Sequence, residues 1–376
     1  MKAFAIALPT LTLYWVLQFA LISTQTLHER TVGTSTIIAR ISPPWPDPSG
    51  IAVSRNGHRV FLGFPRDPYN HATCALAELL PNGDIIPFPD KALSAPSKKP
   101  YAEWIVSPNG IYMDRDDVLW IADDGKREGI PGVPPGAAKV VGIDIATGIV
   151  VRTIVIPPDI MTNDTRLNDL CVDTAHGVIY IANSGFENRS SLIVLNVASG
   201  RGREVLLNHW TTKPDPGFLV FLEGVPKVLG VDKFPSGGVD GITLSADGRT
   251  VYWTINSARR LYSIPTRLLS NFTASERDLE RAAIFEGEHP PCDGITTDES
   301  GNIYFGAVEH ESIVKRSPNG RYEVVAHDAA NFVWPDGLAY RDGYVYATMG
   351  QWNRLGVFNA GVDLRKPPYL VVKIKV

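Results

Sequence analysis

Six short stretches of the sequence place a polar residue at the start of an apolar segment, and these polar residues are the best candidates for chemistry. The clearest stretch is VDGITLSADGRTVYW, residues 239–253, with weaker copies CDGITTDESGNIYFG from Cys292 and WPDGLAYRDGYVYAT from Trp334. Three further copies occur earlier in the chain. Carboxyl, amide and hydroxyl groups can exchange hydrogen bonds with a ligand or bind a hard cation. The six polar residues are Ser49, Asn109, Asn168, Asp240, Asp293 and Asp336.

If these residues converge, they form a polar ring at the mouth of a binding site. Asp240 and Asp336 are then the candidate catalytic groups, with Asn109, Asn168 and Asp293 as ligand-binding residues. The glycine that usually follows would let the backbone turn tightly. The alternative is that each side chain only caps backbone amides in a turn.

Aromatic residues near the same stretches suggest an apolar wall for the site. We expect Trp334 and Trp352 to line it, and His289 to serve as a catalytic acid or hydrogen-bond donor. The alternative for His289 is a loop residue with no role. Other aromatic residues near the expected mouth are Tyr101, Trp104, Trp253 and His310, of which we assign Trp253 to the core and His310 to solvent.

Two acidic pairs, Asp116-Asp117 and Asp123-Asp124, fit solvated turns better than a carboxylate pair for acid-base catalysis. The sequence contains no GxSxG, HExxH, P-loop, GxGxxG or CxxC motif. Serine hydrolase, zinc protease and nucleotide chemistry therefore lack support. We expect that no cofactor is required, with at most one weakly bound calcium ion.

The elements that would position the ring are repeated β-hairpins. Each copy continues as an alternating apolar strand, a turn containing Gly or Asp, and a second strand rich in Val, Ile, Tyr and Trp. Successive copies are 43 to 72 residues apart, a period typical of four-stranded propeller blades. We predict an all-β fold, a single six-bladed β-propeller over residues 34–376. A β-sandwich is the rival arrangement.

The ends of this domain can close the ring. TSTIIARIS, residues 34–42, precedes the first hairpin, and PYLVVKIKV, residues 368–376, ends the chain. We expect these N- and C-terminal strands to pair in one blade, since closure removes exposed sheet edges.

Residues 1–26 have the layout of a secretory signal peptide, with Lys2 before a long apolar run. An uncleaved membrane anchor is the alternative. Sequons at Asn163, Asn188 and Asn271 fit a glycosylated, secreted protein. We expect no stable membrane span after signal cleavage.

Composition limits the partners. The net charge is −4, so no basic surface is indicated for nucleic acid. We expect a monomer whose partner is a small-molecule metabolite. Cys74, Cys171 and Cys292 are too few for a disulfide framework, although one pair and a free thiol would be compatible with the sequence.

Several phrases together resemble the yellow / major royal jelly protein family. They are PSGIAVS, VFLGFPR, IPFPD, DDVLWIADDG, the stretch from Val239 to Thr266 and FVWPDGLAYRDGYVYATMGQWNRL, and they span nearly all of the mature chain. The resemblance implies a secreted six-bladed propeller. Members of this family include pigment-related proteins, nutrient proteins and binders of small amines. Asn353 matches an Asn that lines the amine pocket in binding members, and Arg354 lies beside it.

A more distant similarity is to the gluconolactonase and regucalcin propellers, which hold a divalent ion in the channel. Asn168 and Asp240 match metal ligands of that group, and Asn109 matches a neighbouring substrate-contacting Asn. Ser49 stands where the lactonases have a metal-binding Glu. This departure argues against both a strong metal site and lactone hydrolysis.

Three functions compete. The first is a cofactor-free cyclase or pericyclase of natural-product biosynthesis, acting on a small apolar or aromatic secondary metabolite by a cycloaddition of the hetero-Diels-Alder type. Such catalysis needs shape, desolvation and one or two hydrogen-bond donors. The second is a non-catalytic secreted binder of small amines. The third is a metal-dependent lactonase, which Ser49 disfavours.

Overall fold

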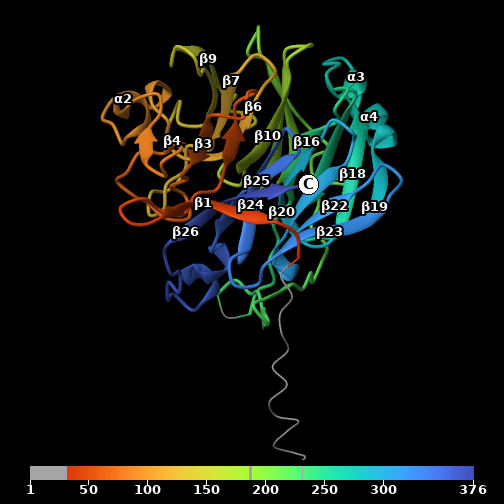
Figure 1. Ribbon diagram of the computed structural model, residues 1–376. Helices are drawn as coiled ribbons and strands as arrows, with labels where there is room; N and C mark the ends of the chain where they lie inside the picture. The colour runs from red at the N-terminus through yellow and green to blue at the C-terminus, as the bar shows by residue number, and fades with distance from the viewer. Residues whose placement is uncertain (1–31, 186–188, 231) are drawn as a thin grey trace, which may run out of the picture.

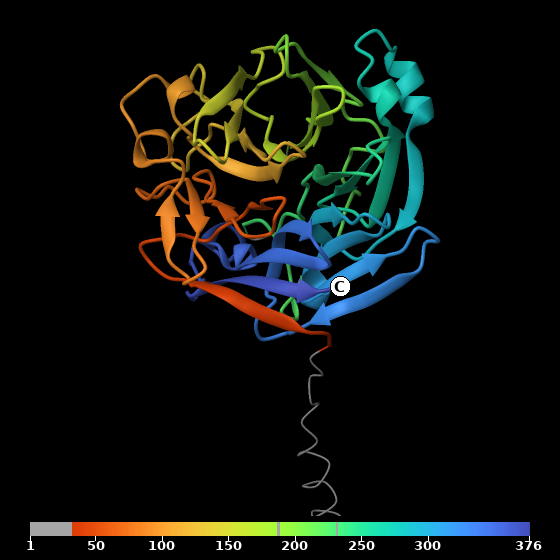
Figure 2. The ribbon, with the colours of Figure 1, turned by 45° about the horizontal axis from the view of Figure 1, so that its top comes forward.

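The computed structural model describes residues 32–185, 189–230 and 232–376. Six four-stranded antiparallel sheets are arranged radially around one axis (Figures 1 and 2). In every sheet the first strand of the hairpin repeat lies innermost, and the inner strands of neighbouring sheets contact one another around a closed ring. The prediction of an all-β, single six-bladed propeller is confirmed.

The first three blades follow one another along the chain. Blade 1 contains β2 (Ile51–Val53), β3 (Val60–Gly63), β4 (Leu76–Leu79) and β5 (Ile85–Pro87). Blade 2 contains β6 (Pro108–Met113), β7 (Val118–Asp123), β8 (Lys139–Asp144) and β9 (Val150–Val155). Blade 3 contains β10 (Leu167–Asp173), β11 (Val178–Ser184), β12 (Ser190–Asn196) and β13 (Gly202–Val205).

The second half repeats the pattern, and its last blade takes its outer strand from the other end of the domain. Blade 4 contains β16 (Val239–Leu244), β17 (Thr250–Ile255), β18 (Arg260–Pro265) and β19 (Ile284–Glu288). Blade 5 contains β20 (Cys292–Thr297), β21 (Ile303–Ala307), β22 (Ser312–Arg316) and β23 (Tyr322–His327). Blade 6 contains β24 (Trp334–Arg341), β25 (Tyr344–Gly350), β26 (Tyr369–Lys375) and β1 (Ser35–Ile41).

The ring closes between the two ends of the domain, as predicted. Strand β1, red in Figure 2, pairs antiparallel with β26, blue, from Ser35 opposite Ile374 to Ile41 opposite Tyr369. This pairing hydrogen-bonds one edge of β26, which would otherwise be exposed. The closing strand thereby joins the first part of the domain to the last.

The core lies between blades because the inner strands are apolar on both faces. Strand β11 is buried along its whole length, and Trp253 of β17 is fully buried. Burial of Trp253 confirms its assignment to the core, and His310 is exposed as expected. Cys74, Cys171 and Cys292 are all buried and free, so none of the three forms the disulfide that the sequence left open.

Short helices and one small hairpin decorate the blades. The helices α3 and α4 lie between β18 and β19 in the sequence and contact β18 at one end of blade 4 (Figure 1). Among the described residues, no helix is long and apolar enough to cross a bilayer. These elements are α2 (Lys91–Ser94), η1 (Tyr101–Glu103), β14 (Phe221–Leu222), β15 (Val225–Pro226), α3 (Thr266–Leu269), α4 (Glu276–Ala282), η2 (Val308–His310), η3 (Trp352–Arg354) and η4 (Gly356–Phe358).

Candidate functional site

A cavity of about 860 Å³ opens where the inner strands begin, and we call it the mouth cavity. All six ring residues predicted from the sequence line it, which confirms that they converge. Trp334 and Trp352 line it too. The walls are completed by loops, chiefly those over residues 64–75, 206–230, 232–238 and 351–368. Their contributions to the cavity include Asp67, Tyr69, Lys227, Leu229, Leu355, Phe358 and Arg365.

A β-bulge at the start of the inner strand directs these side chains. In five blades the register shifts at the polar residue and its successor, for example between Val239 and Ile242 and between Cys292 and Ile295. A bulge reorients the side chain of the extra residue. The polar side chains can therefore turn toward the propeller axis while the apolar residues that follow stay in the core.

The repeated glycine has a different cause from the tight turn expected from the sequence. None of these glycines has a positive φ. Instead, neighbouring blades approach closely: a Cβ on Gly241 would lie 2.8 Å from the carbonyl oxygen of Asp293, and one on Gly50 would lie 2.6 Å from that of Asn109. Blade 3 carries Asp169 at the equivalent position, which adds a carboxyl group near the axis.

Two carboxyl groups of the ring, those of Asp240 and Asp336, favour their neutral forms. Burial raises the pKa of Asp240 and of Asp336 well above the usual range, and the nearby charge of Asp293 raises both further. Burial, assisted by Asp293, raises the pKa of Asp169 to about 7. Desolvation and like charges both oppose ionisation of a carboxyl group. The mouth cavity thus holds carboxylic acids that can donate hydrogen bonds near neutral pH.

Indole and amide groups fix the orientation of three of these carboxyl groups. Trp352 donates from Nε1 to Oδ2 of Asp336 over 2.5 Å, and Trp334 donates likewise to Asp293 over 2.5 Å. The amide of Asn256 donates to Asp240. The two tryptophans therefore serve as apolar wall and as hydrogen-bond donors to the ring at once.

Lys227 is a cavity residue that sequence reasoning missed. It follows β15, and its Nζ lies 4.3 Å from the ring centroid of Trp334 and 4.5 Å from that of Phe358. Burial lowers the pKa of Lys227 to about 8, although the charges of Asp293 and Asp240 oppose this shift. The only signal available in the sequence was a lysine in an apolar loop, VPKVL.

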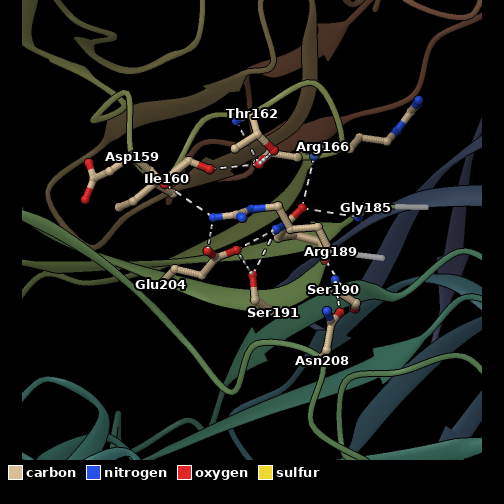
Figure 3. Close-up of polar contacts among 12 residues, drawn as sticks. Asp159, Ile160, Thr162, Arg166, Gly185, Arg189, Ser190, Ser191, Glu204 and Asn208 are labelled. Carbon is tan, nitrogen blue, oxygen red and sulfur yellow. Dashed lines mark hydrogen bonds and ion pairs between the residues drawn. The ribbon is translucent and has the colours of Figure 1, made fainter. Parts of the chain in front are cut away.

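Arg166 and Asp67 form an ion pair on another wall of the mouth cavity, and they too were missed. Blade 3 anchors the backbone of Arg166, whose N–H donates to Oδ1 of Asn183 over 2.9 Å. Figure 3 shows the Arg166 side chain pointing away from this anchor, and Arg189 and Glu204 facing one another beside Ser191. The polar network of blade 3 therefore holds the strand end that presents Arg166.

His289, a predicted catalytic residue, lies outside the mouth cavity. Its ring stacks on Phe305 with centroids 5.2 Å apart, and Nδ1 lies 2.6 Å from the carbonyl oxygen of Pro290. Burial lowers the pKa of His289 to about 4, so the ring is neutral at neutral pH. It does not line the cavity, so its predicted catalytic role has no geometric support.

Asn353 and Arg354, expected to line a pocket, instead hold the hairpin β14–β15. The amide of Asn353 donates to Oε2 of Glu223 over 2.8 Å, and Nε of Arg354 donates to the same oxygen over 2.9 Å. Neither residue lines the mouth cavity. Trp104 is also buried rather than at the mouth, and it stacks on Tyr101.

The interpretation of Asp123-Asp124 as a solvated turn is wrong, because both residues are fully buried. Asp123 pairs with Lys139 over 2.6 Å and accepts hydrogen bonds from the backbone of Val106 and Ser107. Asp124 accepts from the N–H of Leu167 over 2.9 Å. Asp123 therefore joins blade 2 to the loop that precedes it, and Asp124 joins blade 2 to β10 of blade 3. By contrast, Asp116 is exposed, as expected.

The side chains fit a metal ion poorly. Asn168 and Asp240 both line the mouth cavity, but Asp240 already accepts from Asn256 and favours its neutral form. Within the described ranges, no group of three or more His, Cys, Asp or Glu side chains is placed to hold a metal ion. Ser49 supplies a hydroxyl where a strong site would need a carboxylate.

Two of the three sequons can be located. The side chains of Asn163 and Asn271 are exposed. Asn271 accepts hydrogen bonds from the backbone and hydroxyl of Thr273. Asn188 and the expected signal segment, residues 1–26, lie outside the described residues.

Comparison with known proteins identifies relatives of this arrangement. A family model described as major royal jelly protein matches residues 106–363. The search of curated proteins returned no significant match. A luciferin-regenerating enzyme superposes with a TM-score of 0.54 at 11% identity, covering 91% of this chain and 95% of its own.

Two other solved propellers are similar in fold. A calcium-binding protein, regucalcin from Agrobacterium tumefaciens strain C58, has a TM-score of 0.52 at 14% identity, covering 90% of this chain and 93% of its own. A catalytically inactive virginiamycin B lyase from Staphylococcus aureus, solved with quinupristin, has a TM-score of 0.50 at 14% identity, covering 91% and 99%. At these identities the likeness concerns the fold alone.

Proposed function

Since the chain belongs to the major royal jelly protein family, and its propeller presents an aromatic-walled cavity, we propose that it is a cofactor-free cyclase. Its substrate is a small apolar or aromatic secondary metabolite, and the reaction is a cyclisation or cycloaddition of the hetero-Diels-Alder type. The observation that carries the proposal is that the buried carboxyl groups of Asp240 and Asp336, which favour their neutral forms, line one cavity with Trp334 and Trp352.

The mechanism uses binding and hydrogen bonding rather than a covalent intermediate. Apolar walls hold the two reacting parts of the substrate together and exclude water, which lowers the entropic part of the barrier. Protonated Asp336, oriented by Trp352, can donate to an oxygen that gains negative charge in the transition state. Protonated Asp240 can do the same from the neighbouring side of the ring. The proton stays on the carboxyl group or returns to it, so no net proton transfer is required.

The test incubates the purified protein with the reactive intermediates made by the enzymes encoded beside its gene. Product yield and stereochemistry are compared with a heat-inactivated control. We expect faster formation of one stereoisomer, and a rate lowered about 10-fold to 1,000-fold in Asp336→Ala, which removes the donor. Unchanged yield and a racemic product would contradict the proposal.

The acidic ring favours a second candidate, a non-catalytic binder of small amines. Asp240, Asp293 and Asp336 lie at one mouth, and a bound cation would stabilise their ionised forms. This function predicts stoichiometric amine binding that is weakened when Asp240 or Asp336 is neutralised, with no turnover. A metal-dependent lactonase is not proposed, because the ring lacks the carboxylate that Ser49 replaces.

We also propose that the mature protein is a secreted, glycosylated monomer. The support is the apolar segment after Lys2 and the exposed side chains of Asn163 and Asn271. Mass spectrometry of protein from a eukaryotic host tests this, and recovery of an intact Met1 without glycan would contradict it.

A further inference from the structure

The ammonium group of Lys227 lies in the mouth cavity without a hydrogen-bonding or ion-pair partner among the described residues. Its ammonium group lies near the faces of Trp334 and Phe358. Within the described part of the chain, it forms neither a salt bridge nor a side-chain hydrogen bond. Aromatic faces attract a cation but accept no strong hydrogen bond from it. The three N–H donors of a lysine are thus available to a ligand.

The other cations of the cavity are already engaged. Arg166 pairs with Asp67, and Arg365 pairs with Asp363 over 2.7 Å. Arg365 also lies over the ring of Tyr69, with its guanidinium carbon 4.8 Å from the centroid. A ligand oxygen that approaches either arginine must therefore compete with a protein carboxylate. Among the described residues Lys227 has no salt-bridge partner, and the carboxyl groups of Asp293 and Asp240 act on it through space without a direct contact.

The loop that carries Lys227 is held in place before any ligand binds. Phe218, Val220 and Leu222 pack against Val308 and Trp334 in one buried cluster. The backbone N–H of Lys227 donates to the carbonyl oxygen of Val220 over 2.9 Å. On the far side of the hairpin, Glu223 pairs with Arg354. A donor that is fixed in advance costs little ordering entropy on binding.

We propose that Lys227 binds an oxygen atom of the ligand, and that the ligand is an aromatic or conjugated molecule bearing a carboxylate, phenolate or carbonyl oxygen. The apolar part of the ligand lies against Trp334 and Phe358, and its oxygen lies at the ammonium group. This inference rests on the proposed function and adds its substrate class. In the reaction, Lys227 draws electron density toward that oxygen and activates the conjugated system.

The charge of the site agrees with this substrate class. Below about pH 8 the lysine is charged, whereas burial keeps Asp240 and Asp336 largely neutral. The cation would therefore contribute more to recognition than Asp240 and Asp336, opposite to what the formal charges of the sequence suggest.

Naphthoate serves as the probe, measured by isothermal titration calorimetry near pH 6 with quenching of tryptophan fluorescence as a second signal. We expect Lys227→Met to weaken naphthoate binding by at least about 10-fold, because a hydrogen bond to a charged group is lost. Lys227→Arg should retain binding within a few-fold. Equal affinity of the wild type and Lys227→Met would overturn the inference.

A matched control is available in Lys373, whose Nζ lies 4.0 Å from the ring centroid of Tyr344 and 5.1 Å from that of Tyr346, away from the mouth cavity. Lys373→Met removes the same charge and a similar aromatic contact but should leave naphthoate binding unchanged. Circular dichroism and thermal midpoints establish that each variant is folded. If Lys227→Met does not fold, the inference is tested with Lys227→Arg and by comparing the affinities of the wild type for naphthoate and for the neutral naphthylmethanol.

Two further probes separate this inference from the proposed function. Naphthylmethanol, which is neutral, should bind more weakly than naphthoate, and naphthylmethylamine should bind weakest. Tight amine binding that strengthens in Lys227→Met would overturn the inference and favour the amine binder. None of these measurements requires turnover. Naphthoate binding through Lys227 with no cyclisation in any assay would contradict the cyclase proposal. It would still support the inference that Lys227 binds a ligand oxygen.

Discussion

The two ends of the propeller axis carry similar acidic residues but use them differently. At the mouth, the first residues of the inner strands line a cavity of about 860 Å³. At the opposite end, where the inner strands turn back, a second cavity of about 410 Å³ is lined by Asp114, Asp173, Asp247 and Asp298. A sequence motif that places Asp at both ends of a strand therefore supplies two sets of carboxyl groups.

At the opposite end, backbone amides and neighbouring side chains take up the carboxylates. Asp298 accepts from the N–H groups of Ser300 and Asn302, from the Asn302 amide over 2.6 Å and from the Tyr304 hydroxyl over 3.0 Å. Asp114 does the same in blade 2, where its partners include Nε1 of Trp120 at 2.8 Å. These residues close the turns of the hairpins.

At the mouth, the equivalent carboxyl groups bind no such turn. Asp336 receives the indole of Trp352, and Asp240 receives the amide of Asn256. Both face the mouth cavity with raised pKa values. The contrast indicates that the acidic residues of the opposite end stabilise the fold. Those of the mouth are held by side chains, and their burial reduces the free energy of unfolding.

The largest expected effect is therefore at the end without a proposed function. Asp298→Ala removes four hydrogen bonds and leaves the buried Tyr304 hydroxyl and three part-buried donors without this partner, so we expect the free energy of unfolding to fall by about 2 to 4 kcal/mol. Urea denaturation followed by tryptophan fluorescence measures this. The matched variant at the mouth, Asp336→Ala, should change it less near pH 6, because it removes the hydrogen bond from Trp352 rather than four hydrogen bonds. Equal destabilisation of the two variants would remove the distinction between the ends.

A smaller effect concerns pH. The folded-state pKa of Asp336 is raised above its unfolded value, so the proton is bound more tightly in the folded protein. Its contribution to stability is complete below the unfolded pKa and is lost as the pH rises toward the folded pKa. Each unit of difference corresponds to about 1.4 kcal/mol. Asp336→Asn should therefore become more stable relative to the wild type as the pH rises from about 4 to about 8.

Thermal midpoints across this range measure the difference between the two proteins. Asn keeps an oxygen that can accept from Trp352, so the variant tests ionisation more than packing. Asp298→Asn is the control from the opposite end, because it changes a side chain that holds a hairpin turn and does not line the mouth cavity. A wild-type advantage that grows with pH would show that Asp336 is ionised in the folded protein.

The fold could be predicted from the sequence because its signal is local and repeated. Each hairpin is one phrase, and a residue such as Asp240 marks the start of its strand in every copy. The ring at the mouth follows once the phrases are arranged radially. The repeated glycines were recognised, but their cause depends on contacts between blades, such as Gly241 against Asp293, which one phrase does not contain.

The rest of the site comes from loops that carry no repeat. Lys227 reaches the cavity from a connection between blades 3 and 4, and Phe358 from a loop of blade 6. Their meeting depends on the three-dimensional path of two long loops. His289 shows the opposite error. Its position in the loop after β19 suggested a place at the mouth, but its ring is buried against Phe305.

The smallest expected effect is that of calcium. A strong calcium site needs several ionised oxygen ligands, whereas Ser49 is a hydroxyl and Asp240 and Asp336 favour their neutral forms. Binding would have to remove protons and compete with Asn256 and Trp352. We expect added calcium or EDTA to shift the thermal midpoint only slightly.

Ser49→Glu, which places a carboxylate at this position of the ring, should make the midpoint calcium-dependent, since a ligand that binds only the folded state stabilises it. A wild-type midpoint that falls by many degrees in EDTA and recovers with calcium would show that the ring is ionised and organised around a cation. In that case the mouth carboxyl groups, like those of the opposite end, would stabilise the fold through the partners they hold.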